Sequence, residues 1–131
     1  MRIIADTNIL VRVVTEDDPA QARRAQAALA GADLVALPLP ALCEFVWVLA
    51  QGYGIAALEI AEALRRLIDA ANVAVDRPAA EAGLAVLEAG GDFADGVIDH
   101  TGRWLGGEVF LSFDRKAVRR LAGLGHAAEA P

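Results

Sequence analysis

Short apolar runs alternate with longer segments of helical period along the chain. The runs predict strands at residues 2–5, 34–37, 73–75 and 109–112. The longer segments predict helices at residues 19–30, 42–50, 55–71, 78–89, 92–105 and 115–121. Directly after the first run, the segment NILVRVV is compatible with a helical turn that Asp6 would cap. This alternation predicts an α/β domain with a mostly parallel sheet.

The composition agrees with one domain over residues 1–131. A chain of this length with 56% hydrophobic residues can bury one sizeable core. Cys43 is the single cysteine, so no intrachain disulfide is expected. The most apolar stretch, residues 34–50, contains two prolines and Glu44, which argues against a membrane span. Charged residues also interrupt the first apolar stretch, so we expect no leader peptide and a cytoplasmic location.

The formal net charge of −6 limits how this chain could bind nucleic acid. Binding by phosphate neutralisation alone needs an excess of basic residues, which is absent here. Bound divalent cations or a basic partner protein would offset the acids.

Two aspartates follow predicted strands closely. Asp6 comes directly after the first strand, and Asp114 follows the strand EVFLS with one residue between them. In an open α/β sheet, ligands bind at the carboxyl ends of the strands. Glu44 is the single acid in the apolar run LPLPALCEFVWVLA, where an unpaired carboxylate would be costly. For each acid a structural role is the alternative: for Asp6 it is an N-cap, and for Glu44 it is an exposed helix stripe.

Three further aspartates occur in the segment GGDFADGVIDHTGRW. Asp92, Asp95 and Asp99 are spaced by three and four residues, which places them on one face of a helix. Asp92 is a candidate N-cap, and the helix dipole favours Asp95 in the first turn. Asp99 is in the middle of the helix and has neither explanation.

Together the carboxylates suggest a shared cation. Converging carboxylates raise one another's pKa values unless a divalent cation relieves the repulsion. Oxygen ligands suit Mg²⁺ or Mn²⁺, and the scarcity of cysteine and histidine argues against zinc. One or two such cations activate water and stabilise a leaving oxygen, which makes phosphodiester hydrolysis the natural reaction class. Thr7, Asn8 and Ser112 are candidates for supporting polar groups, with turn or capping roles as the alternative.

Four motifs, ADTNIL, PALCEFVWVL, DFADGVID and LSFDR, occur in an order that resembles the PIN domain family. The resemblance covers nearly the whole chain and is closest to the VapC-type toxins of toxin-antitoxin pairs. It implies a three-layer α/β/α domain with a central, mostly parallel sheet of four or five strands. It also implies an Mg²⁺- or Mn²⁺-dependent ribonuclease with one or two cations per site.

By motif, the resemblance assigns the acidic quartet and its surroundings. Asp6, Glu44, Asp95 and Asp114 would be catalytic, and the metal ligands would come from Asp6, Asp95 and Asp114, with Asp99 as an additional acid. The implied partners are RNA, a second copy of the chain in a homodimer, and a small antitoxin whose C-terminal segment enters the acidic groove. Gly96 departs from the family pattern, which commonly has a better helix former there.

Arg115 and Lys116 directly follow Asp114 and are candidates for contacts with an RNA backbone.

Other functions remain as alternatives. An aspartyl-phosphate hydrolase would use Asp6 as nucleophile, but it usually has a second aspartate where this chain has Asn8. A catalytically silent PIN-like module would use the acidic groove only to bind a basic peptide.

Overall fold

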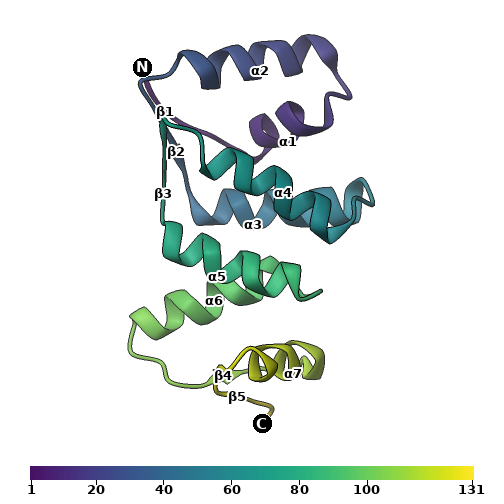
Figure 1. Ribbon diagram of the computed structural model, residues 1–131, viewed down its shortest axis with the longest axis vertical. Coiled ribbons are helices and arrows are strands. Elements are labelled where there is room, and N and C mark those ends of the chain that lie inside the picture. The colour runs from purple at the N-terminus through teal and green to yellow at the C-terminus, as the bar shows by residue number, and fades with distance from the viewer. The chain divides into compact units, whose positions relative to one another are not determined.

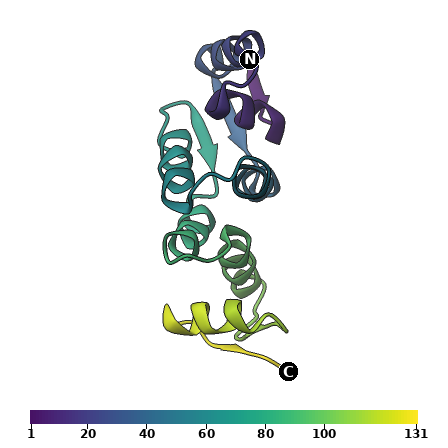
Figure 2. The same ribbon diagram turned by 90° about the vertical axis from the view of Figure 1, so that its right-hand side faces the viewer.

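A parallel three-stranded sheet organises the first part of the computed structural model, which describes all 131 residues. The chain divides into two units, Met1–Asp76 and Arg77–Pro131. In the first unit, strands β1 (Arg2–Ile4), β2 (Leu34–Leu37) and β3 (Val73–Val75) lie side by side in that order. Figure 1 labels these strands and shows them edge-on, and Figure 2 shows them as neighbouring arrows. β2 is therefore the central strand, and β1 has no neighbour on its other side.

Helices connect these parallel strands, because a parallel pair cannot be joined by a tight hairpin. Helices α1 (Thr7–Thr15) and α2 (Pro19–Gly31) lead from β1 to β2. Helix α3 (Leu39–Trp47), a π-helical turn η1 (Val48–Gly52) and helix α4 (Ala57–Ile68) lead from β2 to β3. The sequence marks the start of α2 clearly, since Asp18 caps it and Pro19 occupies its first turn.

Two adjacent helices and a small parallel strand pair form the second unit. Helices α5 (Arg77–Glu88) and α6 (Phe93–Trp104) pack side by side, as both ribbon views show (Figures 1 and 2). Strand β4 (Phe110–Leu111) pairs with β5 (Ala128–Glu129), and helix α7 (Arg115–Gly123) connects them.

Buried leucine and phenylalanine side chains contribute to the core of each unit. Fully buried side chains include Leu10, Leu42, Phe45, Leu49 and Leu64 in the first unit, and Leu84, Phe93 and Leu121 in the second. No helix combines the length and apolar character that a bilayer span requires.

The structure confirms the predicted α/β class, and each of the four predicted strands contains an observed one. The strands, however, fall into two sheets of three and two strands rather than one central sheet. The helical turn expected after Asp6 is a full helix, α1. Strand β5 lies in the C-terminal tail, where the sequence pattern was ambiguous.

Candidate functional site

Asp6 connects the end of β1 to the start of α1. Its backbone is extended, with φ −80° and ψ 159°, and its Oδ1 atom accepts a hydrogen bond of 2.8 Å from the backbone N–H of Thr7. Its Oδ2 atom accepts a bond of 3.3 Å from the side-chain amide of Asn8. Asp6 is therefore a helix cap, as the structural alternative predicted, and its side chain is also exposed at the carboxyl end of a parallel strand.

Thr7 links Asp6 to Glu44. Thr7 is only 9% exposed, and its hydroxyl donates a hydrogen bond of 3.1 Å to Glu44 Oε2 on α3. Glu44 itself lies on the exposed stripe of α3, so it does not have the buried environment that the apolar run suggested. Because Thr7 donates to both carboxylates, it fixes Asp6 and Glu44 beside each other, and four predicted site residues gather in the first unit.

Asp95 is the half-buried acid of the second unit, in the first turn of α6. Burial raises the pKa of Asp95 above its ordinary value, and the nearby charges of Asp92 and Asp114 raise it further. The positive charge of Arg120 acts in the opposite direction. Asp95 and Asp114 are thus close enough to repel each other, which is the condition that a bound cation would relieve.

Asp114 caps α7 in the same way that Asp6 caps α1. Its Oδ1 atom accepts hydrogen bonds from the backbone N–H groups of Lys116 and Ala117, at 3.0 and 3.1 Å. The hydroxyl of Ser112 accepts a bond of 3.0 Å from the Asp114 backbone N–H, so Ser112 supports the turn that holds the aspartate. Arg115 and Lys116 are exposed in the first turn of α7, where a phosphate could reach them.

Asp99 has a different environment. Its side chain is buried, and Arg103 donates to both of its carboxylate oxygens at 3.1 Å through Nε. His126 Nδ1 lies 3.1 Å from Asp99 Oδ2. Arg103 also donates to the carbonyl oxygens of Glu108 and Ala127, at 2.7 and 3.1 Å. Asp99 therefore ties α6 to the C-terminal segment, and its oxygens already have protein partners.

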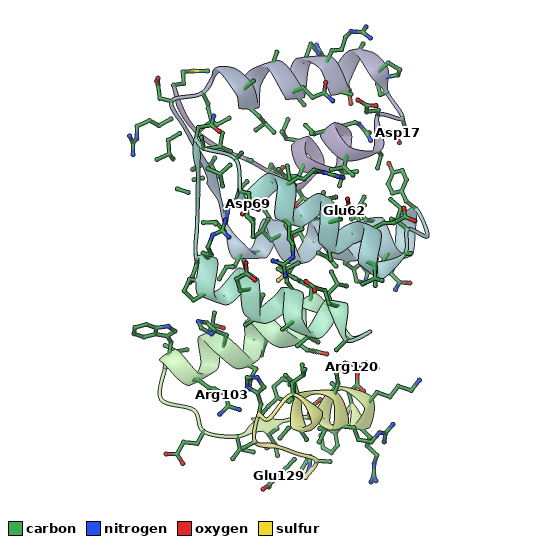
Figure 3. The ribbon with its side chains drawn as sticks, viewed as in Figure 1. Asp17, Glu62, Asp69, Arg103, Arg120 and Glu129 are labelled. Atoms are coloured by element: carbon green, nitrogen blue, oxygen red, sulfur yellow. The ribbon has the colours of Figure 1, made fainter.

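Sequence reasoning missed two arginines, Arg103 and Arg120, which Figure 3 labels. Arg103 follows Asp99 by four residues, a spacing that signals a helical ion pair. Arg120 had no such signal: its side chain runs across Gly91, where an added Cβ would lie 2.4 Å from Arg120 Cδ. This position beside the α5–α6 turn gives Arg120 its influence on Asp95.

Oxygen ligands are available at both groups of acids, as a hard cation requires. The first group offers Asp6 and Glu44, and the second offers Asp95 and Asp114. No group of three or more His, Cys, Asp or Glu side chains gathers in the structure at metal-binding distance.

The model of the family described as PIN domain matches residues 3–124, a range that includes all four of these acids. Comparisons with curated proteins and with solved structures give no match. Because the family model covers most of the chain and both units, the chain belongs to the PIN domain family.

Proposed function

We propose that this protein is an endoribonuclease that uses Mg²⁺ or Mn²⁺ to hydrolyse RNA phosphodiester bonds. PIN domains are generally nucleases that use divalent metals. The observation that carries the proposal is that the family match spans Asp6, Glu44, Asp95 and Asp114. Within the first unit, hydrogen bonds from Thr7 link Asp6 and Glu44, and within the second the charge of Asp114 helps to raise the pKa of Asp95. The two units would then make up a single PIN domain.

The four acids would hold one or two cations directly or through water. A bound cation would lower the pKa of a water molecule and stabilise charge on the attacked phosphate. Thr7 holds Asp6 and Glu44 in position by donating to both, and Ser112 supports the turn that carries Asp114. We leave Asp99 out of this set because Arg103 and His126 already bind its oxygens.

The proposal extends to the partners. Arg115 and Lys116 are exposed next to Asp114, where they would contact the RNA backbone. A toxin role, with a small antitoxin that places a basic C-terminal segment among the acids, would fit the net charge of −6. A homodimer would cover apolar surface such as Trp104 and Leu105, which are 81% and 90% exposed at the end of α6.

Metal binding and RNA cleavage, measured on the same samples, test this proposal. Calorimetry with Mg²⁺ and with Mn²⁺ would compare the wild type with the Asp6→Asn and Asp95→Asn variants. We expect both variants to stay folded and to lose cleavage by about 100-fold or more, together with weaker cation binding. Asp33→Asn is the matched control, because it removes the same charge from an exposed residue that pairs only with the terminal amino group.

The outcomes separate the alternatives. Full cleavage by a folded Asp6→Asn variant would contradict the assignment of Asp6. A wild type that binds neither cation and cleaves no RNA, but binds basic peptides tightly, would be a catalytically silent module instead.

A further inference from the structure

A groove of about 500 Å³, lined by both polar and apolar side chains, lies between α1 and α2 in the first unit. Helix α1 contributes Asn8 and Arg12 to its wall, and α2 contributes Gln21 and Arg24. The groove exists because α2 is rich in alanine: small side chains on this part of the helix leave open the space that larger ones would fill.

One side of this groove adjoins the proposed catalytic residues. Asn8 lines the groove, and its side-chain amide donates the 3.3 Å hydrogen bond to Asp6 Oδ2. A ligand in the groove would therefore lie next to the carboxylate that ends β1.

The two arginines of the groove are in different states. Arg12 is held in place, because its Nε donates to Gln21 at 2.7 Å and its Nη1 lies 3.1 Å from Asp17 Oδ1. Asp17 also accepts a hydrogen bond of 2.6 Å from the hydroxyl of Tyr53, and this second bond helps to hold Asp17 in position beside Arg12. Arg24 has no hydrogen bond or ion pair within the chain, so all five N–H donors of its guanidinium remain available.

The chemistry of the groove favours the backbone of an RNA strand. Its one uncompensated charge is positive, which suits a phosphate and repels a basic peptide. None of its lining side chains is aromatic, so it offers no surface on which bases could stack. Asn8 and Gln21 add amide groups that can bond to sugar or phosphate oxygens without reading a base sequence.

We propose that this groove binds the sugar-phosphate backbone of the RNA beside the cleavage site, with Arg24 donating to a phosphate. The inference rests on the proposed ribonuclease function. It assigns the groove a positioning role that is independent of base sequence: the groove holds the strand so that the bond to be cleaved lies near Asp6.

A matched pair of charge removals tests this role. Arg24→Gln and Arg23→Gln remove the same charge from adjacent exposed positions of α2, but only Arg24 lines the groove. The probe is a short, fluorescein-labelled single-stranded RNA of mixed sequence, cleaved in Mn²⁺ at several salt concentrations. For Arg24→Gln we expect KM to rise about fivefold to tenfold, with kcat within about twofold of the wild type.

The salt dependence identifies the contact as a phosphate contact. Loss of one phosphate contact to a single strand should reduce the slope of log affinity against log salt by about 0.7, and Arg24→Lys should restore most of it. Arg23→Gln should leave KM and the slope close to their wild-type values.

The results separate failure of this inference from failure of the proposed function. If the wild type cleaves the RNA and Arg24→Gln behaves like Arg23→Gln, the groove is not a backbone site. If the effect of Arg24→Gln depends strongly on the base sequence of the probe, the backbone assignment is wrong. If the wild type neither binds nor cleaves the RNA, the proposed function fails and the inference fails with it.

Discussion

Gly96 provides the sharpest test of the packing that places Asp95. Helix α6 approaches α5 so closely at Gly96 that an added Cβ would lie 2.4 Å from the carbonyl oxygen of Ala82 and 2.8 Å from Gly83 Cα. Both of these atoms belong to the backbone, so no side chain can rotate away. An alanine at this position would have to push the two helices apart by about 1 Å to restore an ordinary contact.

Gly102 on the same helix is the matched control. An added Cβ at Gly102 would meet no atom within 4 Å, and its backbone does not require glycine. Both substitutions gain about 1 kcal/mol of helix propensity, whereas only Gly96→Ala has an overpacking cost of about 1–3 kcal/mol. The propensity gains cancel in the comparison, so Gly96→Ala should be less stable than Gly102→Ala by about 1–3 kcal/mol.

Urea denaturation and scanning calorimetry measure this difference. For a chain of this length about 1 kcal/mol corresponds to a change of about 4 °C in Tm, so the two variants should differ by about 4 to 12 °C. Gly102→Ala should melt above the wild type. Equal stability of the two alanine variants would refute the close crossing of α5 and α6 at Gly96.

Two carboxylates give further predictions. Asp99→Asn should lower the free energy of unfolding by about 2 kcal/mol, because it removes the charge that Arg103 and His126 bind; a wild-type midpoint in urea would contradict this tether. Asp95 has a raised pKa, so its ionisation should make the fold less stable as pH rises through that pKa, and Asp95→Asn should remove this penalty. In chelator, the stability that the variant gains over the wild type should therefore be larger at about pH 7 than at about pH 3.5. A gain that is the same at both pH values would show that the charge of Asp95 is not penalised.

The elements that the sequence predicted well are those with local signals. The four strands are short apolar runs bounded by polar or turn residues, and α2 has both Asp18 as cap and proline in its first turn. The π-helical turn η1 and the short strand β5 carry no comparable signal. Their conformation depends on contacts with distant parts of the chain, as the pairing of Phe110 with Ala128 illustrates.

The candidate site likewise contains contacts that local sequence signals predict and contacts that they do not. Thr7 and Asn8, which directly follow Asp6 in ADTNIL, were predicted as candidates for supporting polar groups, and their hydrogen bonds to Asp6 are local. The bond from Thr7 to Glu44 spans 37 residues, so no spacing rule could reveal it. Asp99 has one contact of each kind. Its ion pair with Arg103 has a helical spacing that the sequence can reveal, whereas its contact with His126 has none.

Helix capping and cation binding are compatible at the same aspartate, because one carboxylate oxygen can accept the capping hydrogen bonds while the other binds a cation. At Asp114 both capping bonds go to Oδ1, and no group of the chain donates to Oδ2. The cap fixes the side-chain rotamer and leaves one oxygen free in a known direction, which is the preorganisation that a metal ligand needs. At Asp6 the cap also uses Oδ1, while Oδ2 has only the longer bond from Asn8, an exposed side chain that can move. The capping role of each aspartate is therefore also a reason why each one is suited to hold a cation.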